Sequence, residues 1–226
     1  TTEIYTLSLH DALPIYVVDA GAPIAAFLIG YQAAGPSAGV GAAVAVAIRR
    51  SMGSPVLFRQ RRPGKDAEIF ELVKFRTMQV PDSTASTDAE RLTPLGAWLR
   101  ATSLDELPTL WNVLKGDMSM VGPRPLLVEY LRLYTSEQAR RHEVRPGITG
   151  LAQVAGRNAL TWSQKFALDV EYVEQRSFAL DLRIIARTAW LMLRRDGISE
   201  PGGSTMTPFR GSISPLDAGH TPGSGP

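Results

Sequence analysis

Residues 56–75, VLFRQRRPGKDAEIFELVKF, decide the fold class of this chain. The two ends of the stretch, 56–60 and 69–75, alternate apolar and polar side chains and are rich in residues that favour strands. The residues between them, 61–66, include adjacent proline and glycine and are typical of a turn. The pattern predicts a short β-hairpin.

The sequence after this hairpin favours helices. Amphipathic or apolar periodicity predicts them over 92–101, 105–115, 126–134, 136–144, 162–175 and 180–195, while the polar stretch 79–91 is typical of a loop. We therefore expect an α+β, mainly helical catalytic domain over 51–198. The residues 199–226 are mostly Gly, Pro, Ser and Thr and are expected to form a disordered tail.

The sequence before the hairpin is strongly apolar. Residues 16–48 contain one charged side chain, Asp19, and as a straight helix would reach about 50 Å, against about 30 Å for the apolar core of a bilayer. Gly35-Pro36 interrupts the run near its middle, because proline removes a backbone donor and clashes with the preceding turn. The two halves are about 17 and 18 Å long, so neither spans a bilayer alone.

These lengths favour a re-entrant membrane helix hairpin over 16–50, which enters and leaves through one leaflet. Two alternatives stay open: a pair of core helices in a soluble domain, and a single kinked spanning helix. Arg49 and Arg50 end the segment and mark its cytoplasmic side. Residues 1–15 share no pattern with the apolar segment after them and are interpreted as a non-native leader.

The composition removes several kinds of site. The 226 residues include no cysteine, which excludes disulfides, thiol nucleophiles and cysteine-ligated metal centres, and the three histidines are too few for a multi-histidine metal site. Residues 49–195 carry 23 of the 24 basic residues but 16 of the 22 acidic ones. Twenty of the basic residues are arginine, whose planar fork suits phosphate. This balance indicates an anionic partner, with a solvated basic face as the plain alternative.

A first polar cluster surrounds two adjacent carboxylates, Asp105 and Glu106. Ser103 lies three residues before Glu106, which fits a capping box, and Pro108 is tolerated in a first helical turn. The plain interpretation is a capped helix start. The functional one is that a helix N-terminus keeps Asp105 ionised, as a nucleophile or metal ligand requires, and favours a nearby phosphate.

Two further clusters offer arginines next to glycine and proline. Arg124 lies between Pro123 and Pro125, so its backbone is fixed around a cation, as phosphate binding favours. Arg145 and Arg157 each belong to a glycine-containing loop that is a candidate anion-binding nest. Ordinary turns are the alternative for each. The sequence holds neither a Walker-type phosphate loop nor the glycine pattern of a dinucleotide-binding fold.

Four blocks of the chain together resemble the bacterial sugar transferase family, the small monotopic phosphoglycosyl transferases. The blocks are PVLFRQRRPGKDAEIFELVKFRTM (55–78), TSLDELPTLWNVLKGDMSMVGPRP (102–125), RHEVRPGITGLAQVAGRNAL (141–160) and FALDLRIIARTAWLMLRRDGIS (178–199). They stand in the family's order behind an apolar hairpin. The resemblance therefore covers residues 55–199.

The resemblance implies a defined reaction. Such enzymes move a hexose 1-phosphate from a UDP-sugar to a polyprenyl phosphate, usually undecaprenyl phosphate, and release UMP. This is the initiating step of exopolysaccharide, capsule, O-antigen or glycoprotein glycan assembly. The family's nucleophile matches Asp105, which forms a covalent phosphosugar intermediate. Glu106 matches the Mg²⁺ ligand, with Asp105 beside it in the metal site. Arg100 and Arg124 match phosphate-binding positions, and Pro36 matches the break in the membrane helix.

The resemblance also implies a location and partners. The expected place is the bacterial inner (cytoplasmic) membrane, with the catalytic domain on its cytoplasmic face and membrane lipid as a further partner. A homo-oligomer is left open. The competing hypothesis is a non-enzymatic, arginine-rich protein that binds membrane surfaces or nucleic acid. It does not require the Asp105–Glu106 pair, and nucleic-acid binding would place aromatic residues among the arginines, which this sequence does not do.

Overall fold

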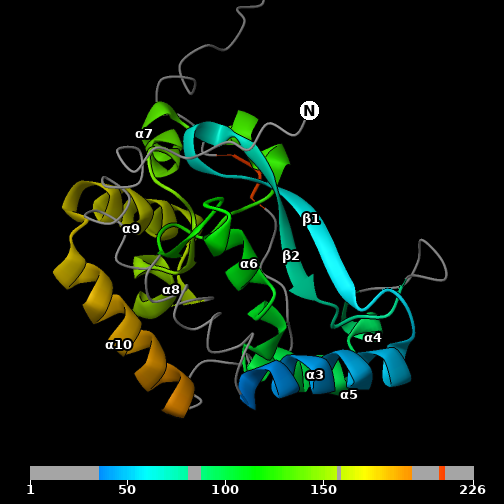
Figure 1. Cartoon of the computed structure of the whole chain (residues 1–226). Coiled ribbons are helices and arrows are strands. Elements are labelled where there is room, and N and C mark those ends of the chain that lie inside the picture. The colour runs from blue at the N-terminus through cyan, green and yellow to red at the C-terminus, as the bar shows by residue number, and fades with distance from the viewer. Residues whose placement is uncertain (1–35, 81–87, 157–158, 195–208, 212–226) are drawn as a thin grey trace, which may run out of the picture.

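The predicted hairpin is present in the computed structural model, which describes residues 36–80, 88–156, 159–194 and 209–211 (Figure 1). Strand β1 (Leu57–Pro63) pairs antiparallel with β2 (Ile69–Phe75), with Leu57 opposite Phe75 and Pro63 opposite Ile69. The predicted turn over 61–66 is wrong in its first half, because the strand continues through Pro63 and the chain reverses at the 3-10 helix η1 (Lys65–Ala67).

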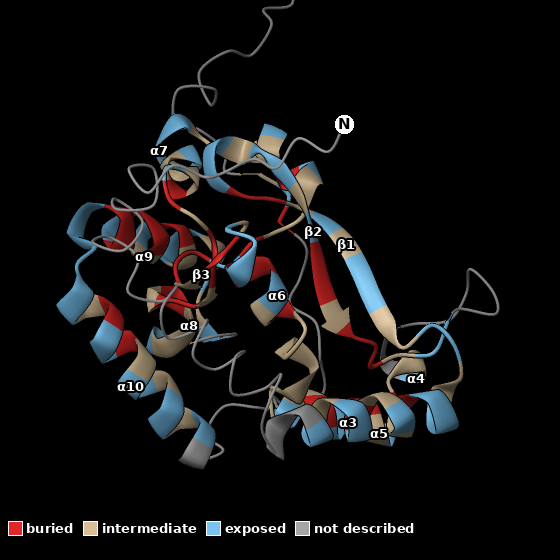
Figure 2. Cartoon of the chain, in the orientation of Figure 1, coloured by how far each residue is buried: buried red, intermediate tan, exposed pale blue. Residues whose placement is uncertain are grey.

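The two strands differ in burial. Figure 2 shows β2 largely buried against the rest of the molecule and β1 mainly exposed along the outer edge. The β2 side chains of Leu72, Val73 and Phe75 belong to the hydrophobic core. Strand β2 is therefore the strand against which the helices at the centre of the molecule pack.

A second sheet was not predicted. Strands β3 (Ser119–Val121) and β4 (Gly147–Thr149) form a parallel pair, with Ser119 opposite Gly147. At this pair the two backbone segments approach so closely that a Cβ on Gly147 would lie 2.1 Å from the Gly122 nitrogen. The glycine after Arg145 and Pro146 therefore allows backbone packing, and the Gly147 N–H donates to Pro123 O rather than standing free in a loop.

The remaining elements are helices, as the sequence predicts, although one of them (residues 88–91) lies within the stretch 79–91 that was expected to be a loop. Its α-helices are α3 (Pro36–Met52), α4 (Asp88–Arg91), α5 (Pro94–Ala101), α6 (Thr109–Leu114), α7 (Ser136–Ala139), α8 (Leu151–Ala155), α9 (Trp162–Gln175) and α10 (Phe178–Arg194). Short 3-10 helices are η2 (Leu104–Glu106), η3 (Val128–Leu133) and η4 (Arg140–His142). The α+β, mainly helical class is confirmed, and α9 has the predicted bounds. The helix expected over 126–134 is instead the 3-10 helix η3.

Helices α8, α9 and α10 pack beside the β3–β4 pair, on the opposite side of the molecule from the hairpin (Figure 1). Their shared core contains Val121, Val144, Tyr172, Val173 and Ile184. An aromatic cluster at the start of α9 also takes in Phe209, which is 5% exposed. The prediction of a disordered tail over 199–226 is therefore wrong at residues 209–211.

The described part of helix α3 runs from Pro36 to Met52 and packs on the domain with one face. Val44 and Ile48 are buried against Phe75 and other apolar side chains, while Val40 and Val46 are exposed. None of the helices within the described ranges is both long and apolar enough to cross a bilayer. Residues 16–35, the first half of the expected membrane hairpin, lie outside the described residues, as does the expected leader over 1–15.

Candidate active site

A large open cavity lies between the hairpin, η2 and the α8–α10 side of the molecule. Its volume is about 1370 Å³, and its walls bring Arg100, Asp105, Glu106 and Arg124 together. Among the described residues that line the cavity, three are acidic: Asp105, Glu106 and Asp169. The basic ones are Arg59, Arg62, Lys74, Arg76, Arg91, Arg100, Arg124, Arg141 and Lys165. This excess of positive charge suits a ligand with several negative charges.

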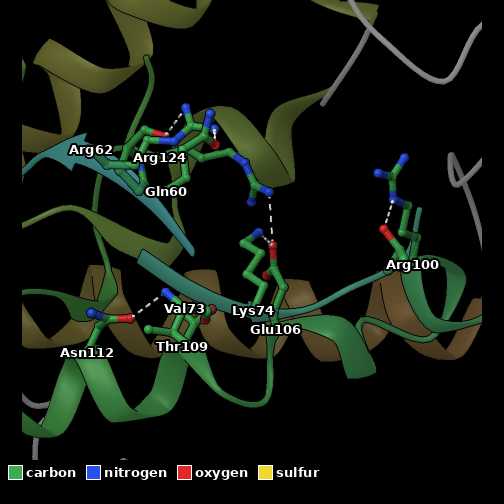
Figure 3. Close-up of polar contacts among 11 residues, drawn as sticks. Gln60, Arg62, Val73, Lys74, Arg100, Glu106, Thr109, Asn112 and Arg124 are labelled. Carbon is green, nitrogen blue, oxygen red and sulfur yellow. Dashed lines mark hydrogen bonds and ion pairs between the residues drawn. The ribbon is translucent and has the colours of Figure 1, made fainter. Parts of the chain in front are cut away.

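Glu106 is the centre of the charged cluster. Its Oε1 accepts from Lys74 Nζ at 2.5 Å and from Arg124 Nη2 at 2.9 Å (Figure 3). Burial alone would raise the pKa of Glu106, but the two cations outweigh it and lower the pKa to about 2. Glu106 is therefore ionised throughout the physiological pH range.

Asp105 differs from its neighbour. Burial, and then the charge of Glu106, raise the pKa of Asp105, while Lys74, Arg124 and Arg100 act in the opposite direction. Within the described part of the chain, no group donates a hydrogen bond to the Asp105 carboxylate. Its oxygens are thus not committed to a structural partner, in contrast to Glu106.

The dyad lies in a 3-10 turn, not at the start of an α-helix. The helix predicted over 105–115 is wrong in its first half: η2 covers Leu104–Glu106, and α6 begins at Thr109. The predicted capping box is also wrong, because Ser103 has φ 56° and its side chain caps nothing. Ser103 therefore separates α5 from η2, whose two carboxylates line the cavity. Helix-dipole stabilisation of Asp105 therefore does not apply.

Helix α6 is fastened to β2, which keeps the dyad opposite Lys74. Asn112, 1% exposed, accepts from the Val73 N–H at 3.1 Å and donates to Glu71 O at 2.7 Å. Thr109 Oγ1 donates to Val73 O at 2.9 Å. Because Val73 immediately precedes Lys74, these bonds fix the strand at the point where its lysine meets Glu106.

Arg124 reaches Glu106 from the segment after β3. Its side chain is 48% exposed, and the charge of Glu106 raises its pKa. Arg62 lies beside it, where Nη2 donates to Gln60 Oε1 at 2.6 Å and Nη1 to Pro125 O at 3.4 Å (Figure 3). Burial and the charge of Arg124 lower the pKa of Arg62 to about 10. The two guanidinium groups therefore lie close together, and Glu106 is the counter-charge of Arg124.

The other predicted arginines have different positions. Arg100 lines the cavity and donates from Nε to Thr77 Oγ1 at 3.1 Å, apart from the Glu106 contacts (Figure 3). Arg145 is half-buried and is not one of the residues that line the cavity. Arg157 lies outside the described residues. Phosphate-binding roles for these three arginines stay predictions.

The carboxylates of this site can bind Mg²⁺ only if substrate or water supplies the remaining ligands. The described residues contain no group of three or more His, Asp or Glu side chains that could enclose a metal. Mg²⁺ in nucleotide enzymes, however, is commonly held by one or two carboxylates with substrate phosphates and water completing its shell. Among the described residues no group donates a hydrogen bond to Asp105, and Lys74 and Arg124 both donate to one oxygen of Glu106. The Asp105 and Glu106 carboxylates therefore meet this smaller requirement.

Sequence reasoning missed Lys74, Arg62 and Arg141. A signal for Lys74 was present, because it is the one charge between two buried apolar neighbours, Val73 and Phe75. Burial and the charge of Arg124 lower the pKa of Lys74. A lysine there is costly unless it has a partner, and Glu106 is that partner.

This chain is similar to known proteins over most of its length. A family model for bacterial sugar transferases matches residues 27–195. The uncharacterized sugar transferase EpsL of Bacillus subtilis is 54% identical over 168 residues, which are 73% of this chain and 83% of that protein.

Two relatives have more specific names. The UDP-glucose:undecaprenyl-phosphate glucose-1-phosphate transferase of Caulobacter vibrioides is 42% identical, over 67% of this chain and 62% of its own length. The undecaprenyl-phosphate galactose phosphotransferase of Salmonella typhimurium is 36% identical, over 64% of this chain and 35% of its own length. Both of these relatives extend well beyond the part that matches. The family model matches most of the length of this chain, and the chain therefore belongs to the bacterial sugar transferase family.

Proposed function

We propose that this chain transfers a hexose 1-phosphate from a UDP-sugar to polyprenyl phosphate, with undecaprenyl phosphate as the acceptor, and releases UMP. The Caulobacter and Salmonella relatives are named for transfer to undecaprenyl phosphate, which supports this acceptor. The observation that carries the proposal is the uncommitted Asp105 carboxylate beside Glu106, in a cavity with a large excess of basic residues.

In the proposed first step, an Asp105 carboxylate oxygen attacks the phosphorus that bears the sugar. A new P–O bond forms to Asp105, the P–O bond to UMP breaks, and UMP leaves with the electron pair. In the second step, an oxygen of polyprenyl phosphate attacks the same phosphorus. The bond to Asp105 breaks, which restores the carboxylate and gives the polyprenyl diphosphate sugar.

The surrounding residues have distinct proposed roles. Arg124 and Arg100 bind the substrate phosphates and offset the charge on the phosphoryl oxygens. Lys74 and Arg124 keep Glu106 ionised and in place. Asp105 and Glu106 would hold Mg²⁺, which when bound neutralises phosphate charge and orients the diphosphate.

The proposed reaction takes place at the cytoplasmic face of the bacterial inner membrane, because the acceptor is a lipid and the donor is a soluble nucleotide. The product would begin the assembly of a polysaccharide or other glycan. The cavity residues do not by themselves select one sugar, since specificity depends on a few pocket contacts.

A panel of UDP-sugars tests the proposal. UMP release is measured for each, with and without polyprenyl phosphate, using the full chain in lipid or detergent. We expect sustained UMP release only when both substrates are present. Asp66, an exposed carboxylate on η1, supplies a matched control: Asp66→Asn retains activity where Asp105→Asn loses it. No UMP from any sugar in the panel, or equal turnover without the lipid acceptor, would contradict the proposal.

A further inference from the structure

Arg141 is a buried arginine that the proposed reaction does not use directly. It lies in η4, and its side chain is 2% exposed. Its Nε and Nη2 both donate to Asp169 Oδ2, at 3.0 and 2.7 Å, and its Nη1 donates to Tyr134 Oη at 3.1 Å. Asp169, on α9, is also almost fully buried.

The same guanidinium group reaches the phosphate-binding segment. Arg141 Nη2 donates to the backbone carbonyl of Arg124 at 2.7 Å. The carbonyls on either side also accept hydrogen bonds: Pro123 O from the Gly147 N–H at 3.0 Å, and Pro125 O from Arg62 Nη1 at 3.4 Å. Three consecutive carbonyls of this segment are therefore held by groups from β4, η4 and β1.

We infer that Arg141 is a positioning residue for Arg124, and this inference rests on the proposed phosphate-binding role of Arg124. Arg124 must meet Glu106 and a phosphate at the same time, so its backbone has to be fixed before the ligand arrives. Arg141 supplies that constraint through the Arg124 carbonyl, and Asp169 orients Arg141. A buried guanidinium needs acceptors for all its donors, and here one of those acceptors is the backbone of a residue whose side chain lines the cavity.

The planar fork of arginine is required for this role. Nη2 donates to both Asp169 and the Arg124 carbonyl. The bond from Nε to Asp169 keeps the planar guanidinium in the orientation that allows Nη2 to reach both acceptors. A lysine at this position keeps the charge beside Asp169, but its single nitrogen lies on a flexible stem. Arg141→Lys is therefore expected to loosen the segment without leaving an unpaired buried carboxylate.

A double-mutant cycle with UDP as the probe tests the inference. UDP affinity is measured by calorimetry on the full chain for wild type, Arg141→Lys, Arg124→Ala and the double variant. If Arg141 acts through Arg124, Arg141→Lys weakens UDP binding about tenfold in the wild-type background and less than about twofold when Arg124 is already alanine. A purely structural role would weaken binding equally in both backgrounds.

Two further variants complete the test. Asp169→Asn keeps an oxygen acceptor in place but removes the charge that orients Arg141, so we expect the same dependence on Arg124. Arg140→Lys is the matched control, because Arg140 adjoins Arg141 but, within the described ranges, its side chain pairs at the surface with Glu137, Glu143 and Glu174. All titrations are run well below the unfolding midpoint that a thermal melt gives for each variant.

The outcomes separate this inference from the proposed function. If Arg124→Ala leaves UDP affinity unchanged, the phosphate-binding role of Arg124 fails, and the positioning role fails with it. If Arg124→Ala weakens binding but Arg141→Lys has the same effect in both backgrounds, only the positioning role is overturned. The positioning role alone is likewise overturned if Arg140→Lys weakens UDP binding as much as Arg141→Lys does.

Discussion

Replacing Arg124 by lysine separates the charge of this side chain from its shape. In the structure one terminal nitrogen, Nη2, is used by Glu106 at 2.9 Å, and the side chain is 48% exposed toward the open cavity. The guanidinium therefore has further donors for a phosphate while it still holds Glu106. A lysine has one nitrogen for both tasks. If that nitrogen stays with Glu106, the bidentate phosphate contact is lost.

The expected loss is about 2–4 kcal/mol of transition-state stabilisation, by analogy with removal of one preorganised oxyanion donor. That corresponds to a fall of about 30- to 900-fold in kcat/KM, measured as UMP release over a range of UDP-sugar concentrations. Stability should change by less than about 1 kcal/mol, because the Arg124 side chain is half-exposed and a lysine can retain the ion pair with Glu106.

Arg59→Lys is the matched control for this prediction. Arg59 also lines the cavity, but it pairs with Glu71 at the exposed edge of the hairpin, where both side chains are at least 50% exposed. Its kcat/KM should stay within about twofold of wild type. Wild-type activity in Arg124→Lys would refute the bidentate contact and leave only a role for charge. Equal losses of activity and melting temperature would instead indicate a structural residue.

Three other outcomes are expected from the same geometry. The acid limb of kcat/KM should have its midpoint above 3.8, since burial and Glu106 raise the pKa of Asp105 and only its ionised form attacks; a pH–rate profile measures this. Chelation of divalent cations should abolish UMP release, and Glu106→Gln should require more added Mg²⁺ to restore it, as a magnesium titration would reveal. Gly96→Ala should destabilise the chain by about 3 kcal/mol or more in urea unfolding, because its Cβ would lie 1.8 Å from Thr77 O.

The hairpin and the long helices were predictable because their patterns are local. Alternation marks β1 and β2, and the capping threonine before α9, Thr161, pairs reciprocally with Gln164 as sequence rules expect. The turn after β1 was placed too early because adjacent proline and glycine at positions 63 and 64 are typical of a turn, whereas the strand continues through Pro63. In the fold the Arg62 side chain points inward to Gln60 and Pro125 O.

The β3–β4 pair could not be predicted from local pattern. Each strand has three residues, and their pairing joins positions 119 and 147, far apart in the sequence. Gly147 in β4 looked like a loop residue, and the close backbone approach at this position explains it. Short strands that pair over long distances leave almost no periodic signal.

The candidate site was predictable in part. Asp105, Glu106, Arg100 and Arg124 were identified by sequence and lie on one cavity. The local conformation was wrong at Ser103, whose left-handed backbone breaks the expected helix start. Lys74 was missed although it lies between two apolar neighbours, because that pattern does not name its partner, Glu106, which it meets across the fold.

The central claim is that Asp105 becomes covalently phosphorylated by the sugar phosphate. The direct measurement is the intact mass of the full chain after mixing with UDP-sugar and Mg²⁺ in the absence of polyprenyl phosphate, followed by peptide mapping. We expect a gain of one sugar phosphate on the peptide that contains Asp105, one UMP released per chain, and loss of the added mass when polyprenyl phosphate is supplied. Asp105→Asn should gain no mass. An unmodified wild-type chain that nevertheless turns over both substrates, or a sugar phosphate attached at another residue, would contradict the claim.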